Sequence, residues 1–116
     1  MTDQLTVADI LTRAACELRP QFTAALQDLA LAHATYAEHA PRSAVGAALA
    51  LSRGCAQAHD ALRREDSPQD AVRAIIAAGP NAWISALNVA GKMLQLPRNV
   101  IQGAASLPLP GEAWPA

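Results

Sequence analysis

One stretch of this chain constrains its fold more than any other, because it carries almost no charge. Between Arg73 and Lys92 lie eighteen residues without an Asp, Glu, Lys or Arg, and over residues 74–111 the only such residues are Lys92 and Arg98. A chain of 116 residues has a large surface for its volume. A segment that places so few charges on that surface is expected to lie at the centre of the fold or beneath a partner.

The composition favours helices. Alanine makes up about a quarter of the residues and aromatic residues only 3%, and alanine is the strongest helix former and a poor strand residue. We therefore predict an all-α protein, a compact bundle of five to six short helices in one domain over residues 1–106, with a Pro-rich extended tail over residues 107–116. The predicted helices span residues 7–18, 21–39, 43–64, 68–78, 82–95 and 98–106.

Three polar residues stand where helices are expected to begin. Thr6 and Asp9 have the spacing of a capping box, in which each side chain bonds the other residue's backbone N–H. Ser67 precedes a proline and has Asp70 three positions later, which is a typical helix start. Asn81 follows Gly-Pro and is predicted to cap the fifth helix.

Small residues recur every four positions on the third predicted helix. Gly46, Ala50, Gly54 and Ala58 form a nearly straight groove that allows another helix to approach closely. Each glycine costs a helix about 1 kcal/mol, so a close crossing would explain the pattern. We predict that Gly46, Ala50 and Gly54 lie at a helix–helix contact and assign them to the partner or dimer interface.

The fifth predicted helix has a narrow polar side. Its polar residues follow at spacings of three, four and three: Ser85, Asn88, Lys92 and Gln95. A helix with such a thin wet face is covered on about three sides, by its own protomer, a second copy or a target. The residues assigned to a partner or dimer interface are Trp83, Leu87, Met93 and Leu94. We expect at least one of Trp83, Met93 and Leu94 to contact another chain.

Self-association follows from the small side chains. Each alanine buries little area, at about 25 cal/mol per Å², so a monomer of this size should be marginally stable. We predict a homodimer. Trp114 in the tail is a possible additional anchor, because tryptophan is frequent at the energetic centres of interfaces.

The residues that could carry chemistry do not form a recognisable site. In an antiparallel hairpin, His33 and His59 would lie on the order of 15 Å apart, and Cys55 with His59 lacks two further metal ligands. Cys16 and Cys55 have no accompanying nucleophile turn, and no phosphate-binding loop is present. The sequence therefore predicts no metal, no cofactor and no enzymatic activity.

Charge and hydropathy indicate where in the cell the protein is expected and which partners are not expected. A net charge of −1 and a pI near 6.2 give no footprint for nucleic acid or for an anionic membrane. Arginine supplies eight of the nine strong bases, which is typical of a GC-rich bacterial genome. The first residues lack the basic and apolar regions of a signal peptide, and no stretch has the roughly 18 apolar residues of a membrane span. We expect a cytoplasmic protein with reduced cysteines.

One segment has a nucleic-acid pattern. Gly91, Gln95 and Ile101 stand at the small, turn and aliphatic positions of a helix-turn-helix, so residues 85–106 resemble that motif of bacterial repressors. Gln95 replaces the usual turn glycine, and Pro97 replaces the usual Ser or Thr. The implied recognition helix carries Arg98, Asn99 and Gln102, whose single charge offers few phosphate contacts.

Three functions remain open. The leading prediction is a non-catalytic protein-interaction module, a small bacterial regulator, adaptor or antagonist that binds another protein through its apolar C-terminal half. The first alternative is a DNA-binding transcriptional regulator that uses the degenerate motif around residues 85–106. The second alternative is a carrier in which small side chains leave a cavity for an apolar ligand.

Overall fold

The computed structural model describes residues 5–64 and 67–107, and over these residues the chain has six helices and no strand. The all-α prediction is confirmed. Nine tail residues, 108–116, lie outside the described residues, and with them Trp114. The helices are α1 (Val7–Glu17), α2 (Arg19–His39), α3 (Arg42–Arg63), α4 (Pro68–Ala77), α5 (Pro80–Met93) and α6 (Arg98–Ser106).

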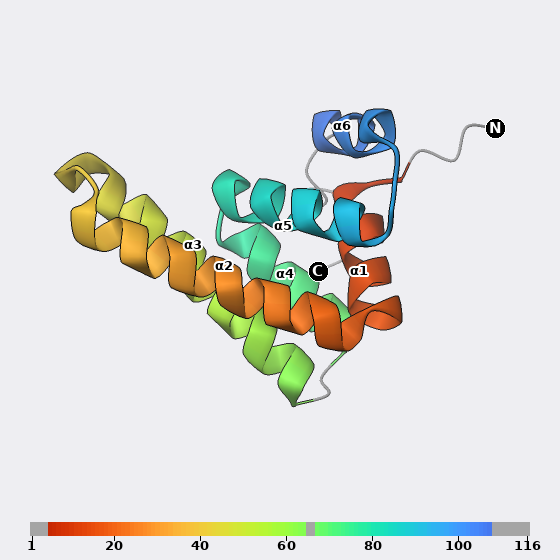
Figure 1. The fold of residues 1–116 in the computed structure, drawn as a ribbon, viewed down its shortest axis with the longest axis horizontal. Coiled ribbons are helices and arrows are strands. Elements are labelled where there is room, and N and C mark those ends of the chain that lie inside the picture. Colours follow the sequence, from red (N-terminus) through yellow and green to blue (C-terminus); the bar gives the residue numbers. More distant parts are fainter. Residues whose placement is uncertain (1–4, 65–66, 108–116) are drawn as a thin grey trace.

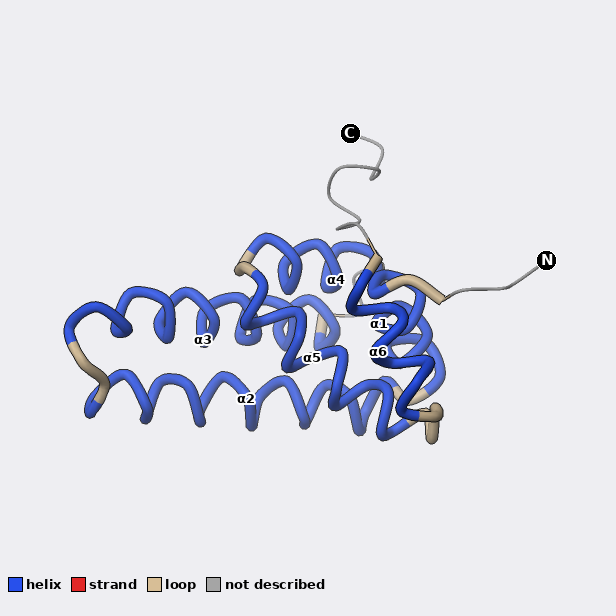
Figure 2. The backbone as a smooth tube through the Cα atoms, turned by 90° about the horizontal axis from the view of Figure 1, so that it is seen from above, coloured by secondary structure: helices blue, strands red, loops and turns tan. Residues whose placement is uncertain are grey.

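The two longest helices, α2 and α3, form an antiparallel hairpin that turns at Ala40 and Pro41. Figures 1 and 2 show that the turn end of this hairpin extends beyond the other helices, which pack against its base and one of its sides. The Ser52 hydroxyl donates a hydrogen bond of 2.8 Å to the Ala30 carbonyl oxygen and places these two residues level with each other. The molecule is thus a helical body from which the turn end of the α2–α3 hairpin projects. We call this projecting part of α2 and α3 the arm.

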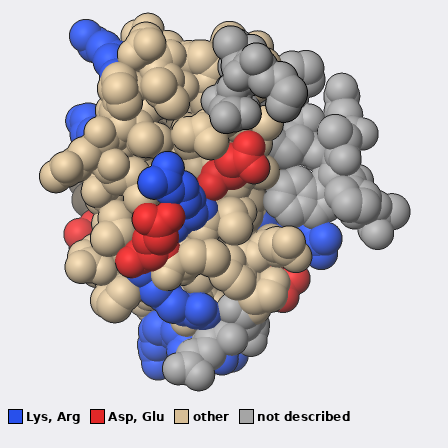
Figure 3. All heavy atoms as spheres, turned by 90° about the vertical axis from the view of Figure 1, so that its right-hand side faces the viewer, with Lys and Arg blue, Asp and Glu red and all other residues tan. Residues whose placement is uncertain are grey.

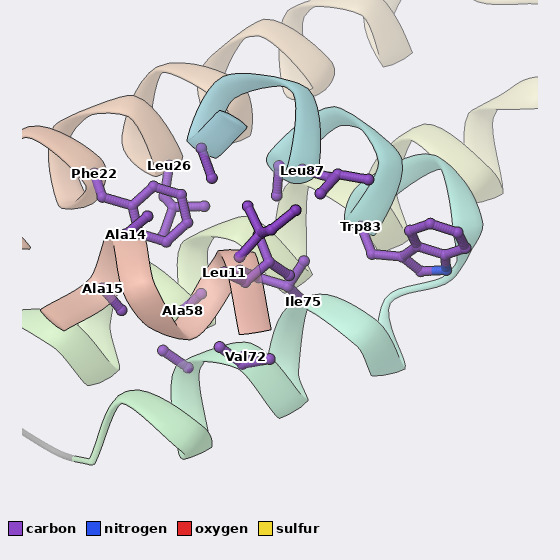
Figure 4. Packing of buried hydrophobic residues seen from close by; sticks show 14 of the residues in the cluster. Leu11, Ala14, Ala15, Phe22, Leu26, Ala58, Val72, Ile75, Trp83 and Leu87 are labelled. Carbon is purple, nitrogen blue, oxygen red and sulfur yellow. The ribbon is translucent and has the colours of Figure 1, made fainter. Parts of the chain in front are cut away.

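The core lies where α1 crosses the base of the hairpin and meets α4 and α5. Figure 4 shows that the side chain of Leu87 from α5 points toward those of Leu11 from α1 and Ile75 from α4. Phe22 and Leu26 close the cluster from α2 and are fully buried. The remaining space is filled mainly by alanines, which lets the helix backbones approach closely; the buried alanines of this cluster are Ala14, Ala15, Ala58, Ala61, Ala71, Ala86, Ala90 and Ala104.

Two of the three predicted helix starts are confirmed. The Asp9 backbone N–H donates to the Thr6 hydroxyl at 3.1 Å, and the Thr6 N–H donates to the Asp9 carboxylate at 3.0 Å. Ser67 accepts a hydrogen bond of 3.3 Å from the backbone N–H of Asp70. The predicted cap at Asn81 is wrong, because α5 already begins at Pro80 and Asn81 lies in its first turn.

The turn before α5 explains that difference. Gly79 has a φ of 110°, a backbone conformation that residues with a side chain rarely adopt. Proline fits the first helical turn, where its missing N–H has no partner to lose. The chain can therefore reverse direction at Gly79 and start the helix one residue later, without a side-chain cap.

Candidate protein-binding groove

A groove of about 340 Å³ lies where the first turns of α5 meet the projecting arm. Three helices line it, and no Asp, Glu, Lys or Arg is among the lining residues. They are His33 and Tyr36 from α2, Ala44, Ala47, Ala48 and Leu51 from α3, and Asn81, Ile84 and Ser85 from α5.

The rim of this groove is apolar and open to solvent. Tyr36 is 53% exposed and Ile84 40% exposed, whereas Ala48 and Leu51 are buried. The Tyr36 hydroxyl makes no hydrogen bond to any other described residue. An aromatic ring with a free polar tip is a frequent anchor at protein interfaces, because its body can be buried while its hydroxyl finds a new partner.

His33 adds the one titratable group of the lining that can change charge near neutral pH. Partial burial lowers the pKa of His33 from its ordinary value, because desolvation disfavours the charged imidazolium. A neutral imidazole can donate one hydrogen bond and accept another. The groove therefore combines an uncharged apolar lining with a few hydrogen-bonding groups.

The arm explains why Tyr36 is accessible. The apolar periodicity of α2 places Phe22, Leu26, His33 and Tyr36 on one face. At the base of the hairpin this face is covered and Phe22 and Leu26 are buried. Tyr36 lies about one turn before the end of α2, at the turn end of the hairpin, which extends beyond the other helices (Figure 1). The periodicity indicates which face of α2 is apolar. It does not indicate how far along α2 the other helices cover that face.

The four residues assigned to an interface on α5 are covered to a large extent by the protomer itself. Trp83 is 6% exposed and Leu87 is fully buried, both within the core cluster. Met93 and Leu94 are half-buried and pack against the same cluster. Trp83 and Leu87 thus present little surface to another chain. Contact of Trp83, Met93 or Leu94 with another chain stays a prediction.

The small-residue row of α3 has two different surroundings. At Gly54, an added Cβ would overlap the Ala78 side chain and lie 3.4 Å from the Ala74 carbonyl oxygen, so α3 and α4 pack closely there, as predicted. Around Gly46 no atom lies within 4 Å of such a Cβ, and Ala50 is exposed. The predicted close crossing is wrong at Gly46 within the protomer, because Gly46 lies in the first turns of α3, at the turn end of the hairpin that extends beyond the other helices (Figure 2).

The cysteines and histidines do not converge. Burial raises the pKa of the Cys55 thiol to about 11, and Cys16 is exposed on α1. His59 contacts Asp60, with 3.3 Å between Nδ1 and Oδ1. Within residues 5–64 and 67–107, no group of three or more His, Cys, Asp and Glu side chains is arranged to hold a metal ion.

The segment that resembles a helix-turn-helix has local features of that motif. Gln95 has a φ of 58°, the left-handed conformation for which the motif usually has glycine. A Cβ on Gly91 would lie 2.5 Å from Cδ1 of Ile101, so the Ile101 side chain of α6 packs directly over Gly91. The Leu96 N–H donates to the Gly91 carbonyl oxygen at 2.9 Å and tightens the turn.

None of the helices in the described part of the chain is long and apolar enough to cross a membrane. The chain matches no family model, no curated protein and no solved structure. Its function is therefore inferred from the geometry of the residues described above.

Proposed function

We propose that this protein is a non-catalytic protein-interaction module, a small regulator, adaptor or antagonist, and that its groove receives an apolar segment of another protein. The observation that carries this proposal is an uncharged groove rimmed by the exposed side chains of Tyr36 and Ile84. Aromatic and aliphatic side chains around a charge-free centre are the usual composition of the buried part of an interface.

The C-terminal half contributes fewer residues to this site than its apolar composition predicts. Ile84 and Ser85 of α5 form one wall, while Trp83 and Leu87 on the same helix belong to the core. The arm supplies the opposite wall. Binding would therefore depend on how α5 and the arm are held together, and a partner would contact residues from both halves of the chain.

An open groove favours a protein over a small molecule. Sites for small ligands enclose most of the ligand surface, typically 70–90%, whereas here both rim side chains are accessible to solvent. The alternative of an apolar-ligand carrier is tested by native mass spectrometry of the purified protein. A hydrophobic molecule retained by the wild type and lost from Leu51→Ala would favour the carrier.

The main test compares groove variants with a matched surface variant. Immobilised wild type, Tyr36→Glu, Ile84→Glu and Gln69→Glu are exposed to a lysate of the source organism, and the retained proteins are identified by mass spectrometry. Gln69 is exposed at the start of α4 and is not among the residues that line the groove. We expect one protein that the wild type and Gln69→Glu retain and both groove variants lose, with unchanged helicity. Equal retention by all four proteins, or none by any, contradicts the proposal.

A DNA-binding regulator is the second candidate, because Gln95, Gly91 and Ile101 have the local geometry described above. The charge distribution gives it less support. Lys92 and Arg98 are the only bases on α5 and α6, and the end of the molecule seen in Figure 3 has mixed acidic and basic side chains instead of a continuous basic surface. Few phosphate contacts mean weak binding.

Fluorescence anisotropy with labelled duplex DNA tests this candidate. Binding at micromolar protein in low salt, weakened by added salt and by Arg98→Ala, would place DNA binding ahead of protein binding. Gln69→Ala serves as the control variant. An anisotropy that does not change at about 100 μM protein removes the candidate, since even non-specific DNA binders associate at roughly 10⁻⁴ to 10⁻⁶ M.

A further inference from the structure

The groove lies on the side of the arm that faces α5. The opposite side of the arm is also accessible to solvent. On α2, Asp28, Leu31 and Glu38 follow at spacings of three and seven and share one stripe. On α3, Arg42, Leu49 and Arg53 follow at spacings of seven and four and do the same. All six residues are exposed and lie roughly opposite the buried positions of their helices; we call these six residues the outer face.

The centre of the outer face is apolar. Leu31 is 60% exposed and Leu49 41% exposed. The hydrogen bond from Ser52 to Ala30 sets the register of the hairpin, so Leu31 and Leu49 lie within about two residues, or roughly 3 Å, of the same level along it. No other described helix covers this side of the arm (Figure 1).

The charges of the outer face are separated by helix. Over residues 20–59, α2 carries Asp28 and Glu38 and no Lys or Arg, whereas α3 carries Arg42 and Arg53 and no Asp or Glu. Glu38 lies near the level of Arg42, and Asp28 near the level of Arg53. None of these four side chains makes an ion pair with another residue in the part of the chain that the structure describes.

We propose that a second copy of this chain docks on the outer face, with a two-fold axis parallel to the hairpin. This rotation places α2 of each copy on α3 of the other and keeps each residue at its level. Glu38 then faces Arg42 of the second copy, and Asp28 faces its Arg53. By symmetry, the two acids of each copy face the two arginines of the other. The exposed side chains of Leu31 and Leu49 from both copies meet at the centre of the interface.

The charge pattern selects this axis over the other simple choice. A two-fold axis across the hairpin would stack α2 on α2 and α3 on α3, and so bring acids near acids and bases near bases. The chosen arrangement forms a four-helix bundle of two stacked hairpins, a common way to cover an apolar hairpin. It also leaves the groove accessible, so a dimer could bind a partner on each copy, and failure of either proposal leaves the other standing.

Two charge-reversed variants test the interface. In one, Asp28→Lys and Glu38→Lys make both helices of the arm basic; in the other, Arg42→Glu and Arg53→Glu make both acidic. Sedimentation equilibrium should find the wild type dimeric at about 100 μM and each variant at least tenfold weaker in self-association, with unchanged helicity. An equimolar mixture should restore the dimer, and native mass spectrometry should identify it as a heterodimer.

Three results would overturn the proposal. They are a monomeric wild type at that concentration, variants that each dimerise as strongly as the wild type, and a mixture in which no heterodimer forms. If a variant loses helicity, the salt dependence of the wild-type dimer decides instead. The dissociation constant should rise several-fold between about 0.05 M and 0.5 M NaCl, because screening weakens exposed ion pairs, and an unchanged constant contradicts the proposal.

Discussion

Gly54 of α3 lies so close to Ala78, at the end of α4, that a methyl group on Gly54 would overlap the Ala78 side chain. The Ala74 carbonyl oxygen lies 3.4 Å from the same position. This contact fixes the end of α4 against the base of the hairpin. Ala78 directly precedes Gly79, at which the chain turns into α5. The position of the groove wall on α5 therefore depends in part on a glycine two helices away.

The same substitution at two glycines of α3 tests this contact. Gly54→Ala should lower the free energy of unfolding by about 1–3 kcal/mol, because α4 must shift to admit the methyl group. Gly46→Ala should leave it equal or raise it by up to about 1 kcal/mol, because the position is open and alanine favours the helix. Urea denaturation of both variants checks this, and equal effects would contradict the close approach at Gly54.

Replacing Gln95 by glycine should stabilise the protein. Gln95 has a left-handed backbone conformation, which costs a residue with a side chain roughly 1–2 kcal/mol and costs glycine little. We expect Gln95→Gly to raise the free energy of unfolding by about 0.5–1 kcal/mol. Gln102→Gly, inside α6, is the control and should lower it by about 1 kcal/mol. A loss of stability in both variants would contradict the left-handed turn.

Trp83 has a buried indole N–H for which the described residues offer no acceptor. Leaving such a donor unpaired costs about 1–3 kcal/mol. Trp83→Phe removes the donor and keeps most of the apolar area, so the free energy of unfolding should stay within about 1 kcal/mol of the wild type. Trp83→Ala should lower it by about 3–5 kcal/mol. If phenylalanine is as damaging as alanine, the indole N–H has a partner.

Acidification should weaken the fold through His33. Its pKa is lowered in the folded state by burial, so the unfolded chain binds the proton more readily. The stabilisation is complete above the unfolded pKa, near 6.5, and is lost as the pH falls through the lower folded value. Denaturation between about pH 7 and pH 5 should give a smaller pH dependence for His33→Gln than for the wild type.

Local signals in the sequence predict the helices well. Pro97 stands before a helix predicted over residues 98–106, which are the bounds of α6, and the Thr6 and Ser67 caps mark α1 and α4. These signals act over three or four residues and need no knowledge of the rest of the fold. The element types could therefore be predicted from the chain alone, and each predicted helix bound lies within two residues of the observed one. The largest differences are at the start of α2 and at both ends of α5, where Gly79 stands at the cap position predicted for Asn81.

The groove could not be predicted in the same way. Tyr36 follows the apolar periodicity of Phe22 and Leu26, and only the length of the arm beyond the body makes it accessible. The reverse holds for Trp83, whose apolar surroundings indicate that it is covered but not by which part of the molecule. Both questions depend on how helices far apart in the sequence are placed, and periodicity within one helix contains no information about that.

Photo-crosslinking from the rim of the groove tests the central claim, that this protein acts by binding another protein there. The photoreactive residue p-benzoylphenylalanine replaces Tyr36, Ile84 or, as control, Gln69, and the cells of the source organism are irradiated. We predict one discrete adduct with another protein from positions 36 and 84 and none from position 69. No adduct from either rim position, or the same adducts from all three, would contradict the account.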